Sequence, residues 1–61
     1  MFTIQVCWSN SRILWEEESE DDALAIQRAK IILKDPTFEG DYVNVVTSDG
    51  ELVWDSRKEE S

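Results

Sequence analysis

The sequence predicts an α+β fold of order ββαββ, in which one helix packs on one face of a four-stranded antiparallel sheet. Three observations lead to this fold. Large apolar side chains occupy every second position of residues 2–8, as in a half-buried strand. Residues 19–34 repeat apolar side chains at helical spacing after an acidic start. Asp49-Gly50 separates two further apolar runs and is a strong hairpin signal.

The first hairpin is predicted from a turn at residues 9–12, because Ser and Asn bond locally to the backbone. Residues 13–16 then return as the second strand. With Asn10 and Ser11 as a two-residue loop, the register follows, and a longer loop would shift it. The expected pairs are Trp8 with Ile13, Val6 with Trp15, and Cys7 with Leu14 on the opposite face.

The helix is expected to open at Ser19, where residues 19–22 have capping-box spacing ahead of an apolar run. It is expected to stop at Asp35, because Pro36 disfavours helical geometry in the residue before it. The main apolar stripe consists of Ala25, Ile26, Ala29, Ile32 and Leu33, and it is widened by Leu24 and Ile31.

The second hairpin joins residues 42–48 to residues 51–55 through Asp49-Gly50, the preferred pair for a type I′ turn. We expect a single domain over residues 1–56 and a frayed polar tail over residues 57–61. We find no internal repeat, and the strand order stays open. The expected pairs are Thr47 with Leu52, Val45 with Trp54 and Val46 with Val53. The expected core is Phe2, Ile4, Val6, Trp8, Ile13, Trp15, Ile26, Ala29, Leu33, Val43, Val45, Leu52 and Trp54.

Composition argues for binding rather than catalysis. The 61 residues contain no His and one Cys, which leaves no imidazole base and too few Cys and His ligands for a zinc site. We therefore expect no enzyme activity, no cofactor and no metal. No apolar run is long enough for a membrane span, and an unpaired Cys suits the cytoplasm. The formal charge of -8 argues against direct contact with nucleic acid.

An acidic run between the second strand and the helix is the first candidate site. It has two interpretations: a solvated junction with helix-start chemistry, or an electrostatic docking surface for a basic partner. The stronger form of the docking interpretation is nucleic-acid mimicry, in which carboxylates lie where a duplex has phosphates. The candidate residues are Glu16, Glu17, Glu18, Glu20, Asp21 and Asp22.

The sheet face away from the helix is the second candidate site. Its expected composition is more apolar than a solvated face requires, which indicates either scattered surface residues or a homodimer or partner face. The residues are Cys7, Leu14, Tyr42, Val46 and Val53. The three Trp are expected in the core rather than as a base-stacking platform.

The functional hypothesis is a small acidic interaction protein that is not an enzyme. In its sharpest form it inhibits or regulates a basic, nucleic-acid-handling protein, in a setting such as a phage or mobile element. The alternative is a structural homodimer or assembly subunit that associates through its outer sheet face.

Overall fold

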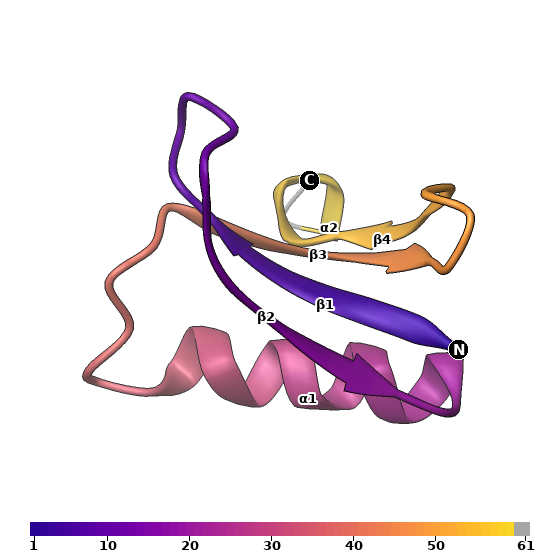
Figure 1. Ribbon diagram of the computed structural model, residues 1–61. Helices are drawn as coiled ribbons and strands as arrows, with labels where there is room; N and C mark the ends of the chain where they lie inside the picture. The colour runs from indigo at the N-terminus through magenta and orange to yellow at the C-terminus, as the bar shows by residue number, and fades with distance from the viewer. Residues whose placement is uncertain (60–61) are drawn as a thin grey trace.

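The computed structural model describes residues 1–59, which form four strands and two helices around one core. They follow one another as β1 (Phe2–Cys7), β2 (Ile13–Ser19), α1 (Asp22–Lys34), β3 (Tyr42–Thr47), β4 (Leu52–Asp55) and α2 (Ser56–Glu59). The strands form one antiparallel sheet in the order β2-β1-β3-β4, with α1 on one face (Figure 1). The predicted α+β fold is confirmed, and β1 and β3 are the central strands.

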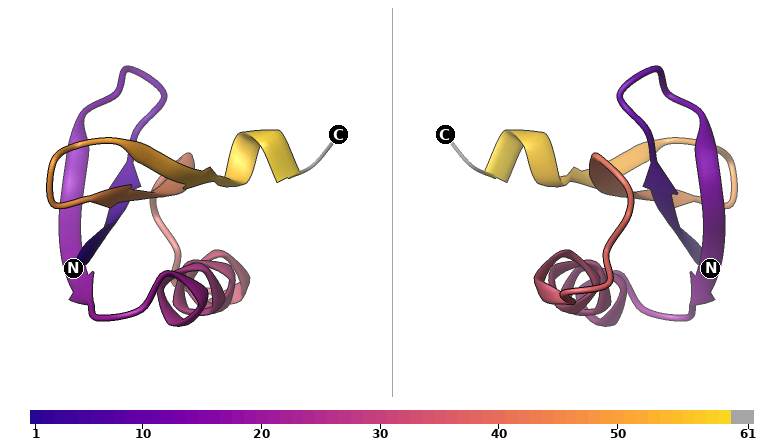
Figure 2. Two further views of the ribbon diagram at one scale, coloured as in Figure 1. Left: turned by 90° about the vertical axis from the view of Figure 1, so that its right-hand side faces the viewer. Right: turned by 90° about the vertical axis from the view of Figure 1, so that its left-hand side faces the viewer.

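The sheet is strongly twisted, so that the β1–β2 hairpin stands across the direction of the β3–β4 hairpin (Figure 2). Twist of this kind follows from the right-handed preference of L-residues in strands. It lets α1 cross beneath the two central strands while β2 remains at an edge of the sheet.

Helix α1 begins at Asp22 and has Asp21 as its N-cap. The Asp21 carboxylate accepts a hydrogen bond from the backbone N–H of Ala23 at 2.9 Å, which satisfies one of the free donors of the first turn. The prediction that Ser19 opens the helix is wrong. Ser19 is the last residue of β2 and pairs with Phe2, so its backbone is still extended.

The buried face of α1 is the predicted apolar stripe. Ala25 and Ala29 are fully buried one turn apart, and Ile32 follows a turn later. The small alanine side chains bring the helix close to the sheet. The helix ends at Lys34, just before Asp35-Pro36, as predicted. On the sheet, the core comprises Ile4, Val6, Val43 and Val45, with Phe2, Ile26, Leu33, Phe38 and Trp54 packed partly buried against it.

The β1–β2 turn has three loop residues rather than the predicted two. The N–H of Trp8 donates to the carbonyl of Arg12 at 2.8 Å, and the N–H of Ser11 donates to the carbonyl of Trp8 at 2.9 Å. Ser11 has φ 69°, in the left-handed region. A turn followed by one left-handed residue is a common three-residue hairpin loop.

This longer loop changes the register near the turn. Cys7 pairs with Ile13, and Leu14 is the extra residue of a bulge that lies between two paired positions. Beyond the bulge the register returns to the expected one. Of the predicted pairs, Val6 with Trp15 is confirmed, whereas Trp8 with Ile13 and Cys7 with Leu14 are wrong.

The β3–β4 turn repeats the same loop. The N–H of Thr47 donates to the carbonyl of Glu51 at 2.8 Å, and Gly50 is left-handed with φ 91° as the third loop residue. The predicted two-residue type I′ turn is therefore wrong, because Gly50 closes a three-residue loop instead. Of the predicted pairs, Val45 with Trp54 is confirmed, whereas Thr47 with Leu52 and Val46 with Val53 are wrong. Val46 instead pairs with Leu52, next to a bulge.

The two hairpins are equivalent residue by residue, with residues 6–16 matching residues 45–55. Both have the same turn hydrogen bonds, a left-handed third loop residue and a bulge two residues after the turn. Identical residues at matching positions are Val6 and Val45, Ser9 and Ser48, and Trp15 and Trp54. Only these three identities accompany the shared turn and bulge, so the likeness of the two hairpins leaves little trace in the sequence.

Four residues predicted for the core are more than a third exposed: Trp8, Ile13, Trp15 and Leu52. Each has a structural reason. Trp8 starts the turn, and Trp15 lies on the edge strand. Ile13 and Leu52 pair with residues of the outer face, so the shifted registers turn them away from α1.

A small second cluster lies on the outer face at the start of α2. Tyr42 and Asp55 are buried there, and the Arg57 guanidinium lies 3.7 Å from the centre of the Tyr42 ring. The backbone N–H of Val43 donates to the buried Ser56 hydroxyl at 3.1 Å. Residues 57–59, which the sequence places in the polar tail, belong to α2, and residues 60–61 of that tail lie outside the described part.

Replacing Ser11 with Gly is expected to raise the free energy of unfolding by about 0.5–1 kcal/mol, because a left-handed backbone is costly for a residue with a Cβ. Urea denaturation of the wild type and of Ser11→Gly measures the gain. Ser9→Gly is the matched control, since Ser9 has no positive φ and Gly only loosens the unfolded chain there. Equal effects of the two substitutions would contradict the prediction.

Candidate protein-interaction surface

Strand β2 (Ile13–Ser19) forms a free edge of the sheet. It pairs with β1 on one side, and no other strand in residues 1–59 pairs with its second side. In an antiparallel pair every second residue of an edge strand directs its N–H and C=O away from the neighbour. This row of backbone donors and acceptors is the kind of edge to which another strand can bind.

Three carboxylates of the acidic run lie within β2 rather than in a junction. Glu16 is on the outer face, where its carboxylate accepts a hydrogen bond from Gln5 Nε2 at 3.0 Å. Glu18 pairs with Thr3 on the same face. Glu17 is on the α1 face and forms an ion pair with Arg28 at 2.8 Å. The hydrogen bond to Glu17 raises the pKa of the Arg28 guanidinium.

The other three acidic residues continue this path into the helix start. Glu20 and Asp21 connect β2 to α1, and Asp22 is the first residue of α1. The Asp21 carboxylate is engaged as the N-cap, and the Asp22 carboxylate also lies 2.7 Å from the N–H of Ala23. The structure thus brings all six predicted residues onto one continuous border. It gives Asp21 and Asp22 helix-start contacts and Glu17 an ion pair.

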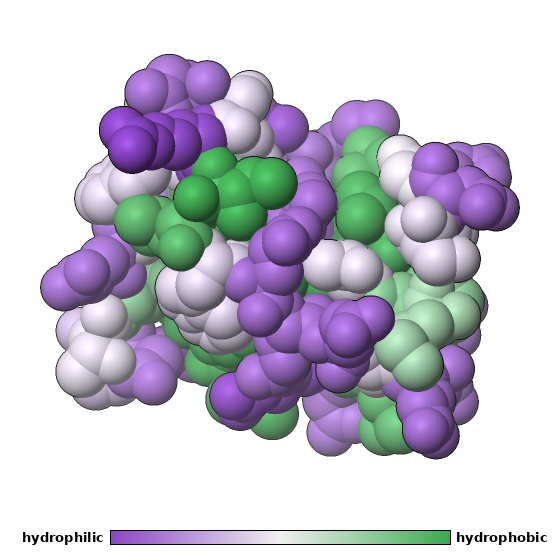
Figure 3. All heavy atoms as spheres, viewed as in Figure 1, coloured by the Kyte–Doolittle hydropathy of each residue, from purple (hydrophilic) through white to green (hydrophobic). Residues whose placement is uncertain are grey.

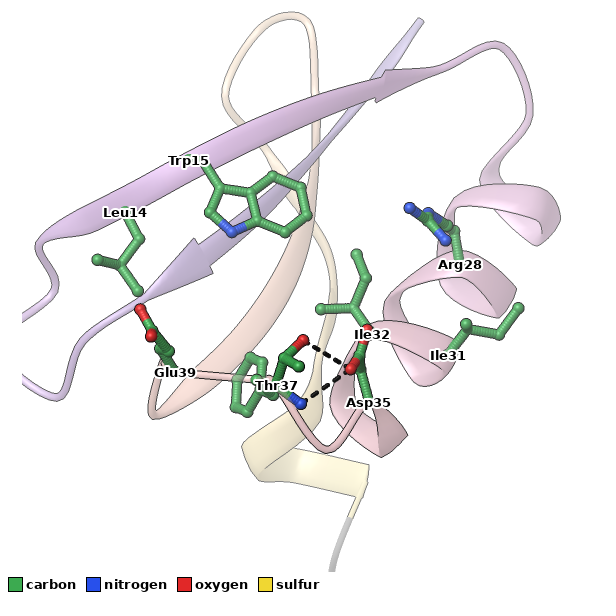
Figure 4. A pocket seen from close by; sticks show the side chains of 9 residues that line it. Leu14, Trp15, Arg28, Ile31, Ile32, Asp35, Thr37 and Glu39 are labelled. Carbon is green, nitrogen blue, oxygen red and sulfur yellow. Dashed lines mark hydrogen bonds between the residues drawn. The ribbon is translucent and has the colours of Figure 1, made fainter.

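A groove lies between the first half of β2 and the last turns of α1. Its volume is about 220 Å³. Trp15 extends from β2 towards Ile32 of α1, Leu14 points towards Glu39, and the loop after α1 closes the end of the groove (Figure 4). The complete lining is Leu14, Trp15, Arg28, Ile31, Ile32, Asp35, Thr37, Phe38 and Glu39.

Much of the apolar lining is in contact with solvent. Trp15 is 44% exposed and Ile31 is 52% exposed. On the face seen in Figure 3, hydrophobic atoms near the β1–β2 hairpin adjoin a hydrophilic band across the middle of the molecule. The sequence shows Ile31 outside the main helix stripe, but it did not predict that Trp15 would line the same groove. The exposed position of Ile31 was therefore visible in the sequence, whereas the position of Trp15 in the groove was missed.

The end of the groove is held by a local capping arrangement. The Asp35 carboxylate accepts hydrogen bonds from the backbone N–H of Thr37 at 2.9 Å and from its hydroxyl at 2.7 Å (Figure 4). These bonds lower the pKa of the Asp35 carboxyl. They fix the chain after α1 in the direction that carries Phe38 back to the core.

The outer-face candidates do not form one exposed patch. Cys7 and Tyr42 are buried beside α2, Val46 is half-buried and Val53 is 36% exposed at a bulge. The placement of Leu14 on the outer face is wrong, because the bulge turns it into the groove beside α1. This lowers the apolar area that the outer face offers to a second copy.

Cys7 is an enclosed thiol. Burial raises its pKa above the ordinary value, although a hydrogen bond with Tyr42 and the nearby Arg57 act in the opposite direction. A buried thiol with a raised pKa is a weak nucleophile. Among the side chains that the structure describes, no three Cys, Asp or Glu lie close enough together to hold a metal ion.

Comparison with protein-family models, with curated proteins and with solved structures finds no significant match to this chain. Neither α1 nor any other helix within the described residues has the length and apolar character that crossing a membrane requires.

Proposed function

We propose that the chain is a non-enzymatic interaction module of the cytoplasm that binds a basic protein through the acidic border formed by β2 and the start of α1. The observation that carries this proposal is the continuous run of six carboxylates, three on the free edge strand β2 and three in the connection and first residue of α1. Electrostatic attraction by such a border accelerates encounter with a basic surface and selects against acidic partners.

Nucleic-acid-handling proteins are the partner class that fits this chemistry best, because their binding sites concentrate Lys and Arg for phosphate contacts. An acidic protein that occupies such a site excludes the nucleic acid and so inhibits or regulates its partner. Along β2 the alternate residues Glu16 and Glu18 lie on one face, so their Cα atoms are roughly 7 Å apart. This spacing of two negative charges on one face supports a mimic of the phosphate backbone.

The test is retention of a partner on immobilised protein at low salt, followed by stepwise salt elution and mass spectrometry. We expect a basic nucleic-acid-binding protein that salt releases, since screening weakens attraction between exposed charges. The corresponding amide substitutions of Glu16, Glu17, Glu18, Glu20, Asp21 and Asp22 should abolish retention. Asn at position 21 keeps the ability to cap α1.

A matched pair of double variants separates position from net charge. Glu16→Gln with Glu18→Gln removes two charges from the β2 edge, and Asp49→Asn with Glu51→Gln removes two from the β3–β4 turn. We expect only the first pair to weaken retention, by at least tenfold. Equal retention by the two double variants would refute the proposal.

The alternative function, assembly of a homodimer through the outer sheet face, has a different signature. It predicts a dimer that persists at high salt and dissociates when Val46 and Val53 are replaced with Lys. Burial of Cys7 and Tyr42 within the chain leaves less of that face for a partner, so we place this function second. Size-exclusion chromatography with light scattering measures the oligomeric state directly.

A further inference from the structure

We propose that the free edge of β2 binds an extended segment of the basic partner as an added strand, with one large apolar side chain of that segment inserted in the groove beside Trp15. This inference rests on the proposed function, since it specifies the partner segment and how the same border holds it. Three features of the structure lead to it: the open edge, the sides on which its charges lie, and the groove.

The backbone of β2 supplies the first feature. Its seven residues extend along the edge of the sheet with one side unpaired by any described strand. A strand added there gains main-chain hydrogen bonds whatever its sequence, and the pockets on either face then select its side chains. The bulge at Leu14 lies at one end of β2, which leaves residues 15–19 as a regular edge.

The charges of β2 decide between two occupants of this edge. A second copy pairing through its own β2 would bring rows of Glu side chains together, and like charges on neighbouring strands repel. A segment with Lys or Arg facing Glu16 and Glu18 replaces this repulsion with cross-strand attraction. The carboxylates thus disfavour self-association and at the same time admit a basic strand.

The faces of β2 on which its side chains lie determine the residue pattern that we expect in the partner segment. Glu16 contacts Gln5 on the outer face, and Glu18 pairs with Thr3 there. Trp15 lies on the other face, where it lines the groove with Ile31. Because side chains of a strand alternate between faces, the segment carries basic residues at alternate positions and apolar residues between them.

The groove suits one side chain rather than a whole ligand. Its volume of about 220 Å³ is below the roughly 300 Å³ at which small-molecule pockets begin. Its apolar lining includes Trp15 and Ile31, each more than 40% exposed. An aliphatic or aromatic side chain placed there removes this apolar surface from water and adds to the hydrogen bonds of the edge.

The experiment uses the full chain and the peptide acetyl-Lys-Val-Lys-Leu-Lys-Val-Lys-amide. Binding is followed by NMR through the backbone amides of β2 and the indole N–H of Trp15. Two N-methylated isomers, substituted at the odd or at the even positions, keep the charge and remove opposite sets of N–H donors. Because only one set can face β2, we expect one isomer to lose at least tenfold in affinity and the other less than threefold.

Matched protein variants test the groove. Ile31→Lys places a charge in the groove, whereas Leu24→Lys adds the same charge at a similarly exposed position of α1 that does not line it. We expect Ile31→Lys to weaken peptide binding at least tenfold and Leu24→Lys less than threefold. Both residues are exposed, so both variants keep the fold, which their amide spectra verify.

The outcomes separate this inference from the proposed function. If the peptide binds with strong salt dependence but both N-methylated isomers and both Lys variants bind alike, the border acts by charge alone and strand addition is overturned. Failure of the peptide to bind, with a basic partner still released by salt, also overturns it while the proposed function stands. Self-association through β2, seen as concentration-dependent shifts without peptide, overturns the choice of a basic occupant.

Discussion

Gly40→Ala is expected to lower the free energy of unfolding by about 2–3 kcal/mol, a large share of the stability of so small a domain. A Cβ at Gly40 would lie 2.8 Å from Val6 Cγ1, 3.0 Å from the Cys7 carbonyl oxygen and 3.2 Å from Phe38 Cζ. The Cys7 carbonyl cannot retreat easily, because it accepts a hydrogen bond from the Asp41 N–H at 2.8 Å. Thermal and urea denaturation measure the loss, which corresponds to roughly 10 °C or more in Tm.

Gly50→Ala provides the comparison for this prediction. Gly50 has φ 91° but no atom within 4 Å of an added Cβ, so Ala there costs backbone strain alone, about 1 kcal/mol. A loss at Gly40 no larger than the loss at Gly50 would be inconsistent with steric exclusion. Combining Gly40→Ala with Val6→Ala removes the shortest contact, so the double variant should lose less than the sum of the two single losses.

Asp55→Asn is expected to destabilise the fold by about 1–2 kcal/mol at neutral pH. The buried Asp55 carboxylate accepts hydrogen bonds from Arg57 through its backbone N–H at 2.9 Å, Nε at 3.2 Å and Nη2 at 2.8 Å. Hydrogen bonds to a charged group stabilise more than neutral ones, although exposure of the Arg57 side chain reduces this contribution. Urea denaturation at pH 7 measures it, and Asp49→Asn in the exposed turn is the control for loss of one charge.

The effect of Asp55 depends on pH with a defined sign. The hydrogen bonds from Arg57 lower the pKa of the Asp55 carboxyl in the folded protein. Its stabilising contribution is therefore complete above the ordinary carboxyl pKa of about 3.9, and it is lost as pH falls through the lower folded value. The difference in unfolding free energy between wild type and Asp55→Asn should shrink below about pH 4. A difference that stays constant down to pH 2 would contradict this origin.

The order and type of the four strands and of α1 were predictable because each depends on local periodicity, whereas α2 was not predicted. The alternation of residues 2–8 and the stripe around Ala25 and Ala29 needed no knowledge of the rest of the chain. The strand registers were not predictable in the same way, because they depend on which loop residue becomes left-handed. Ser11 carries no sequence signal for that role, and Gly50 fits a two-residue and a three-residue loop equally well.

The candidate site likewise has features that the sequence predicts and features that depend on tertiary structure. The acidic residues are visible in the sequence, but their position on a free edge follows from β1 pairing with β3, which the sequence left open. The groove depends on the loop after α1 and on the bulge at Leu14, which complete its lining beside Trp15 and Ile31. Burial of Cys7 and Tyr42 likewise depends on α2, where a frayed tail was expected.

The central pairing of β1 with β3 has a consequence for how the chain folds. Each hairpin joins neighbouring segments and can form within about 10 µs, whereas the pair Phe2 with Thr47 closes a loop that spans β1, β2, α1 and β3. That closure costs entropy before its contacts form, so we expect docking of the two preformed hairpins onto α1 to limit the folding rate. Because the two hairpins share one turn geometry, we expect each to act as a local folding nucleus. We expect the cooperative step of folding to be the pairing of β1 with β3, which joins the two hairpins.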